Sequence, residues 1–192
     1  MNSKELAPGI ELWENFLTEE EHLFLINTCR SLTQEDWEKT FKKQFDYNIN
    51  RDGKEPDSDW KDRIFEFPKD HPVIISINEK IRNFVVSEGE YPGLLCRAQR
   101  HYPGSFLKEH YDAVQSNSLS HALVLYLNDD YSGGELYFKK FNIEFNPPVR
   151  SLIKFPSTED YMHGINMVND GPDRFVLTSF VWNNEQSAKT GR

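Results

Sequence analysis

The sequence contains little cysteine, no long hydrophobic run and fewer basic than acidic residues. Cys29 and Cys96 are the only cysteines in 192 residues. Two cannot build a disulfide framework, so we expect a reducing, cytoplasmic setting. No stretch approaches the roughly 20 apolar residues that cross a membrane, and residues 1–9 lack the apolar segment of a signal peptide. The 22 basic and 31 acidic residues give a net charge of −9, which argues against nucleic acid as the main partner.

Aromatic residues, in contrast, are frequent, with 14 Phe, 8 Tyr and 4 Trp. Together with a hydrophobic fraction of 38%, this content excludes a disordered or collagen-like chain. The length suits one domain. We therefore expect a single domain over residues 1–192, with helical support in residues 1–90 and a β-rich core in residues 94–183.

Helical periodicity is confined to the first half of the sequence. Thr18 and Glu21 have the spacing of a capping box, and the apolar residues that follow predict a helix over residues 18–32. A second apolar stripe predicts a helix over residues 71–87, with Asp70 as its N-cap. These two helices should each bury one face against the rest of the domain.

The second half has the texture of an all-β core. Clusters of Gly, Pro, Asn and Asp separate short β-type segments, which predicts a sandwich, jelly roll or barrel. The predicted strands are residues 94–102, 107–113, 119–128, 134–138, 141–146, 151–155, 162–168 and 173–183. Ahead of them, the polar residues 46–62 predict a loop, which serves either as a solvated connection or as a lid over a site.

His110 and Asp112 are the first candidates for chemistry. As positions i and i+2 of a strand they point to one face, where they can hold a divalent ion but cannot complete its coordination. So short a pattern also arises by chance. A third ligand would come from another of the six histidines. His163 precedes the last predicted strand, and two histidines with one carboxylate form the facial triad of non-haem Fe(II) oxygenases.

Arg174 is the second residue of the last predicted strand, which is mostly apolar on both faces. A buried guanidinium needs an anion and offers a carboxylate two parallel hydrogen bonds. Thr178 lies on the same face and can add a hydroxyl donor. A structural salt bridge with one of the 31 acidic residues is the alternative role for Arg174. His101 and Tyr102 are neighbours on a strand and therefore point to opposite faces.

Several motifs follow one another in a fixed order within residues 98–182. They are Tyr102-Pro103-Gly104, His110-Tyr111-Asp112, Leu125-Tyr126-Leu127-Asn128, Ser132-Gly133-Gly134-Glu135-Leu136, His163, Arg174 and Thr178. Their order and combination resemble the 2-oxoglutarate- and Fe(II)-dependent dioxygenases, and among them the prolyl 4-hydroxylase-like group. The fold that this resemblance implies is α+β and mainly β. It is a double-stranded β-helix, or cupin-like jelly roll, with N-terminal helices against one sheet.

The resemblance also implies a metal centre and its cosubstrates. His110, Asp112 and His163 would ligate Fe(II), while 2-oxoglutarate and O2 would be cosubstrates and ascorbate an optional reductant. The family hydroxylates an unactivated C–H bond and converts 2-oxoglutarate to succinate and CO2. The iron does the difficult chemistry, and the protein supplies geometry and a dry pocket.

Four residues would bind the cosubstrate by the same resemblance. Arg174 would pair with the distal carboxylate of 2-oxoglutarate, with Thr178 and Tyr126 beside it. Tyr102 would lie against the cosubstrate near the metal. Collagen-type prolyl hydroxylases usually have Lys where this chain has Arg174, so the arginine is more similar to the oxygen-sensing and ribosomal-protein prolyl hydroxylases.

The substrate that the resemblance favours is a prolyl residue in a peptide or protein. Alternatives with the same chemistry are hydroxylation of a free amino acid or another small molecule, and nucleobase dealkylation, against which the charge of −9 argues. A non-catalytic jelly-roll binding module is the alternative from a different class. We expect no membrane partner, and the sequence leaves the oligomeric state open.

Overall fold

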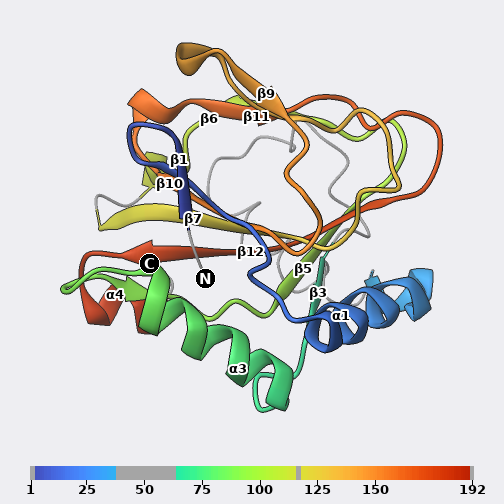
Figure 1. Cartoon of the computed structure of the whole chain (residues 1–192), viewed down its shortest axis with the longest axis horizontal. Coiled ribbons are helices and arrows are strands. Elements are labelled where there is room, and N and C mark those ends of the chain that lie inside the picture. The colour runs from blue at the N-terminus through green and yellow to red at the C-terminus, as the bar shows by residue number, and fades with distance from the viewer. Residues whose placement is uncertain (1–2, 38–63, 116–117, 191–192) are drawn as a thin grey trace.

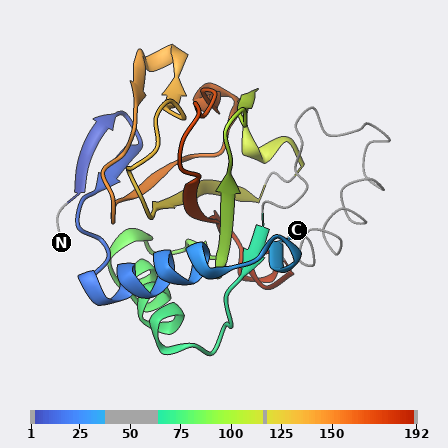
Figure 2. The same ribbon diagram turned by 90° about the vertical axis from the view of Figure 1, so that its right-hand side faces the viewer.

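The computed structural model describes residues 3–37, 64–115 and 118–190, so the predicted loop over residues 46–62 lies outside the described residues. Within them, two antiparallel sheets form a jelly roll, and helices cover the outer face of the larger sheet (Figures 1 and 2). The predicted fold class, mainly β with a double-stranded β-helix core and supporting helices, is confirmed.

The larger sheet has eight strands. In spatial order they are β1 (Ser3–Ala7), β2 (Ile10–Trp13), β10 (Leu152–Pro156), β7 (Leu119–Tyr126), β12 (Arg174–Trp182), β5 (Arg97–His101) and β3 (Ile64–Glu66), with β4 (Tyr91–Pro92) beside β12. The smaller sheet has the order β6 (Leu107–His110), β11 (His163–Ile165), β8 (Leu136–Phe138) and β9 (Ile143–Phe145).

The helices lie outside the two sheets. Among the described residues they include α1 (Glu19–Ser31), α3 (Pro72–Lys80), the π-helical turn η1 (Ile81–Val85) and the C-terminal α4 (Glu185–Thr190). Three 3₁₀ turns, η2 (Asp112–Gln115), η3 (Lys139–Phe141) and η4 (Glu159–Tyr161), join strands. None of the helices in these described segments is long and apolar enough to span a membrane.

Alternation along β12 divides the core into two layers. Phe175 and Leu177 pack with α1 and α3 beneath the larger sheet. Arg174, Val176 and Thr178 face the opposite way, into the space between the sheets. Successive residues of a strand point to opposite faces, so a single strand both anchors the helical layer and supplies the wall of an internal cavity.

The capping box at the start of α1 forms as predicted. Thr18 Oγ1 accepts from the Glu21 backbone N–H at 3.2 Å, and Glu21 Oε2 accepts from the Thr18 backbone N–H at 2.8 Å. Glu21 also pairs with Lys80 of α3 and accepts a hydrogen bond from Ser76 at 2.8 Å. The same carboxylate therefore starts one helix and ties it to the other.

Two sequence expectations for the helical half need correction. His71, not Asp70, caps α3, and its Nδ1 accepts from the Val73 backbone N–H at 3.3 Å. The His71 ring also stacks on Phe24 of α1 at 4.0 Å, a contact from another helix that no local pattern contains. The N-terminal segment is not purely helical either, because β1, β2 and β3 fall within residues 1–90.

Candidate metal centre

The three residues predicted to bind the metal lie close together at one end of the smaller sheet. His110 is the last residue of β6, and His163 is the first residue of β11, directly opposite it in the antiparallel register. Asp112 does not continue the strand as predicted. It begins the 3₁₀ turn η2, and this turn brings its carboxylate back to the two imidazoles. The structure thus brings together all three residues predicted to bind the metal.

The donor atoms of the three side chains converge. Nε2 of His110 lies 3.7 Å from Oδ1 of Asp112, and Nε2 of His163 lies 3.7 Å from Oδ2. Each imidazole uses its other nitrogen on a backbone carbonyl, Lys108 O at 2.8 Å and Tyr161 O at 3.0 Å. A nitrogen that faces a carbonyl must carry the proton, so the Nε2 lone pairs face the carboxylate, as in metal sites with ordered outer hydrogen bonds.

Burial of these polar side chains costs free energy when no cation is bound to them. It raises the pKa of Asp112 to about 6, although the nearby His110 acts in the opposite direction. Burial also lowers the pKa of His163 to about 4, with a further contribution from His110, so this imidazole is neutral at pH 7. Oδ2 of Asp112 is buried without a hydrogen-bond partner. One carboxylate and two imidazole nitrogens that converge in this way fit a divalent cation.

Apolar groups surround His163. The rings of Phe155 and Phe138 lie 4.6 Å and 5.6 Å from its imidazole. The next residue, Gly164, has no room for a side chain, because a Cβ there would clash with the Tyr137 hydroxyl. Close packing on both sides therefore fixes His163 in place.

A cavity of about 200 Å³ extends from the three candidate ligands into the space between the sheets. Arg174 lines it and is 1% exposed. Among the described residues, no carboxylate forms an ion pair with Arg174, and its Nε has no hydrogen-bond partner. The structural salt bridge considered from the sequence is thus not formed within the described segments. Since an unpaired buried cation is costly, the cavity is suited to an anion.

Tyrosines hold the Arg174 guanidinium in position. Nη2 of Arg174 donates to the hydroxyl of Tyr126 at 3.1 Å, and the Tyr131 ring lies 5.9 Å away. Burial raises the pKa of Tyr126 to about 12, so the phenol keeps its proton. Gly134, with φ +66°, packs against this arrangement, because a Cβ there would lie 3.1 Å from Arg174 Cδ. The lack of a side chain at Gly134 therefore leaves space for Arg174.

The predicted cosubstrate residues do not all reach the cavity. Arg174, Tyr126 and Thr178 line it, but Tyr102 is absent from its wall. Tyr102 follows β5, whose residues Arg97, Gln99 and His101 face the cavity at alternate positions. His101, 1% exposed, forms the cavity wall at the end of β5, and the role of Tyr102 beside the cosubstrate stays a prediction.

Sequence reasoning passed over Gln99, His101 and Tyr131. The polar residues at alternate positions of residues 97–101 were the available signal, because an inward-facing strand with polar side chains indicates a polar cavity. Trp182 ends β12, the strand that Arg174 begins. A register shift after Val181 interrupts the alternation there, and Trp182 does not line the cavity.

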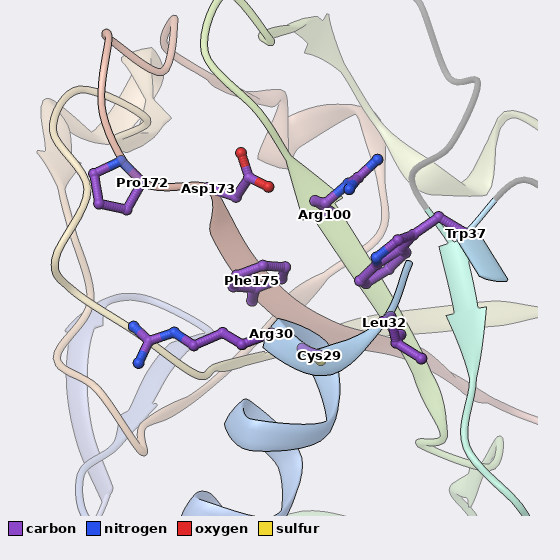
Figure 3. A pocket seen from close by; sticks show the side chains of 8 residues that line it. All are labelled: Cys29, Arg30, Leu32, Trp37, Arg100, Pro172, Asp173 and Phe175. Carbon is purple, nitrogen blue, oxygen red and sulfur yellow. The ribbon is translucent and has the colours of Figure 1, made fainter. Parts of the chain in front are cut away.

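A second cavity, of about 250 Å³, lies on the other side of β12 (Figure 3). Its lining is Cys29, Arg30, Leu32, Trp37, Arg100, Pro172, Asp173 and Phe175. Arg30 is paired with Asp130 at 2.7 Å, and burial raises the pKa of Cys29 to about 12. A protonated thiol is neither a nucleophile nor a metal ligand at neutral pH, so we place the chemistry in the first cavity.

Comparison with known proteins agrees with this geometry. Residues 96–182 match the family model of the 2OG-Fe(II) oxygenase superfamily. The curated proteins contain no match. Among solved structures, a viral collagen prolyl hydroxylase from Paramecium bursaria Chlorella virus-1, in a 2OG complex, is 19% identical with a TM-score of 0.64, over 92% of this chain and 97% of that one. A Pseudomonas putida prolyl-4-hydroxylase is 18% identical with a TM-score of 0.59, over 92% and 94%.

The family match confirms the resemblance to the 2-oxoglutarate- and Fe(II)-dependent oxygenases. Fe(II), 2-oxoglutarate and O2 are the cofactor and cosubstrates of this family, and the convergent donors of His110, Asp112 and His163 fit the metal. The two solved structures share the fold of this chain.

Proposed function

We propose that this chain is an Fe(II)- and 2-oxoglutarate-dependent dioxygenase that hydroxylates a prolyl residue of a peptide or protein. Its residues 1–192 would act as one domain, and the reaction would convert 2-oxoglutarate to succinate and CO2. The proposed metal ligands are His110, Asp112 and His163. The proposed cosubstrate residues are Arg174, Tyr126, Thr178 and Tyr102.

The observation that carries the proposal is the set of residues that line one cavity. The facial triad lies on its wall, together with the buried Arg174, which has no carboxylate partner among the described residues. A 2-oxo dicarboxylate has the complementary groups: a keto acid end that chelates a metal and a distal carboxylate for a guanidinium. A cavity of about 200 Å³ suits a small molecule of this kind.

The chain's own residues bind and orient the cosubstrate in this account. Arg174 neutralises the distal carboxylate, while the phenol of Tyr126 accepts from Arg174 and keeps its own proton free to donate. Apolar side chains, including Leu136, Phe155 and Val176, line the remaining wall and exclude water. Fe(II), when bound, supplies the activation of O2 that hydroxylation of an unactivated C–H bond requires.

The choice of a prolyl substrate rests on the two solved structures, both of which are prolyl hydroxylases. It is tested by incubating the protein with Fe(II), 2-oxoglutarate, O2 and a panel of proline-containing peptides. We expect peptide-stimulated formation of succinate and the gain of one oxygen atom on proline, both absent from Asp112→Ala. Succinate formation that no peptide stimulates, and that free amino acids stimulate instead, would contradict the prolyl substrate while leaving the oxygenase chemistry intact.

A further inference from the structure

Gln99 makes a side-chain contact within the cavity that the proposed function does not yet use. It lies on β5, and its Nε2 donates to Thr178 Oγ1 on β12 at 3.0 Å. Its Oε1 lies 3.4 Å from Nε2 of His101. All three residues line the cavity. The contact is diagonal, because the backbone register pairs Gln99 with Val176 and Thr178 with Arg97, so formation of the sheet does not require it.

The direction of the Gln99–Thr178 hydrogen bond determines what Thr178 can do. A hydroxyl has one proton and can both accept and donate. Because Thr178 Oγ1 accepts from the Gln99 amide, its proton must point elsewhere. Among the described residues, no acceptor takes that proton in a hydrogen bond. The hydroxyl is therefore held as a donor that a ligand in the cavity can use.

The same arrangement recurs at the other hydroxyl of the cavity. Tyr126 Oη accepts from Arg174 at 3.1 Å, and its proton is then available to an anion. Two hydroxyls from neighbouring strands thus each accept a hydrogen bond from a nitrogen donor that faces the same cavity. Preorganised donors of this kind bind an anion without first having to reorient.

We propose that Gln99 is a positioning residue that holds the Thr178 hydroxyl as a hydrogen-bond donor toward the carboxylate oxygens of 2-oxoglutarate, with His101 orienting the Gln99 amide. This inference rests on the proposed function. Gln99 acts through Thr178, so removing the amide should lower the affinity for the cosubstrate only when the threonine hydroxyl is present.

The test is a double-mutant cycle of Gln99→Met and Thr178→Val, read by the Kd for 2-oxoglutarate. Isothermal titration on the Mn(II)-loaded protein keeps turnover out of the measurement. We expect about a tenfold loss of affinity in Thr178→Val, the magnitude of a hydrogen bond to a charged group. Gln99→Met should lose about threefold, and the double variant should bind no more weakly than Thr178→Val alone.

Two results would overturn the inference. One is an unchanged Kd in Gln99→Met; the other is a double variant whose loss is the product of the two single losses, since independent sites add in free energy. Mn(II) affinity is the internal control and should be equal in all four proteins. Wild-type protein that binds Mn(II) but no 2-oxoglutarate would instead refute the proposed function.

A second substitution covers the case in which Gln99→Met does not fold. Gln99→Glu keeps the size of the side chain but accepts from Thr178, so it reverses the hydrogen bond and turns the Thr178 oxygen toward the anion. Its loss of affinity should exceed that of Thr178→Val and should shrink when both substitutions are combined. An equal loss in the Thr178→Val background would show only the effect of the added charge and would overturn the role of Gln99.

Discussion

His110 and His163 face each other across β6 and β11, with ring centroids 4.5 Å apart. Nδ1 of each ring hydrogen-bonds to the backbone carbonyl two residues earlier in the chain, Lys108 O for His110 and Tyr161 O for His163. Both imidazoles therefore have their orientation and tautomer set by backbone before any metal binds. A site with preoriented ligands loses little entropy on binding and is sensitive to the removal of either ring.

Removal of one imidazole should abolish tight metal binding. We expect His163→Ala to weaken Mn(II) affinity at least about 100-fold while the protein stays folded. Loss of a residue that only orients a metal ligand already weakens metal affinity by up to about 100-fold, and loss of the ligand itself should cost at least as much. Titration calorimetry measures the loss. His121→Gln is the matched control, because His121 pairs with Glu90 at 2.9 Å and does not line the cavity. Equal metal affinity in the two variants would show that His163 is not a ligand.

Asp112 should destabilise the metal-free protein at neutral pH. Its pKa is about 6 in the folded chain against an ordinary value of 3.8, so the folded state binds the proton more tightly than the unfolded state. The contribution of this group to stability therefore falls as the pH rises between these two values. Asp112→Asn avoids the buried charge and should raise the free energy of unfolding at pH 7.5 by up to about 3 kcal/mol.

Thermal melts in the presence of a chelator measure this effect. The advantage of Asp112→Asn over wild type should be largest at pH 7.5 and should disappear below pH 4, where both side chains are neutral. Addition of Mn(II) should then stabilise only the wild type. A variant that is less stable than wild type at pH 7.5 without metal would contradict the account of Asp112.

Arg174 should serve the cosubstrate and not the metal. We expect Arg174→Gln to weaken 2-oxoglutarate binding at least about 30-fold, the effect of breaking a buried charge pair, with Mn(II) affinity unchanged. Arg100→Gln is the matched control for charge, since Arg100 is its near neighbour on β5 but lines the other cavity. Unchanged affinity for 2-oxoglutarate in Arg174→Gln would make Arg174 a structural residue.

Gly134 should matter to the cosubstrate through the space that it leaves for Arg174. Gly134→Ala places a Cβ 3.1 Å from Arg174 Cδ at a φ of +66°, so we expect weaker 2-oxoglutarate binding together with a Tm lower by about 2–8 °C. Gly89→Ala has similar backbone strain, at φ +83°, but nothing within 4 Å of its Cβ. Gly89→Ala should therefore lower Tm and leave the affinity for 2-oxoglutarate unchanged. Equal 2-oxoglutarate affinity in the two variants would contradict this contact.

Much of the fold was predictable because its signals are local. The strands of the second half are short alternating segments between turn residues, and the α1 capping box lies within four residues. The first strand, β1, was missed because it is an edge strand with a largely exposed SKELA sequence and no apolar face. Its partner β2 gains its burial from β10, far away in the chain.

The His110, Asp112 and His163 cluster was predictable from motif order, whereas the cavity wall was not. Whether His101 or Tyr102 faces the cavity depends on register, since a shift of one residue turns each side chain to the other face. The Gln99–Thr178 contact joins residues 79 positions apart and exists only because β5 and β12 are neighbours. Pairing of distant strands is the information that sequence patterns lack.

The most direct test of the central claim is anaerobic titration of the metal-free protein with Fe(II) and 2-oxoglutarate, followed by visible absorbance. A 2-oxo acid that chelates Fe(II) through its keto and carboxylate oxygens produces a weak metal-to-ligand charge-transfer band. We predict this band in the wild type and its loss in Asp112→Ala. A folded, iron-containing wild-type protein that shows no band with 2-oxoglutarate would contradict the assignment of the triad and of its cosubstrate.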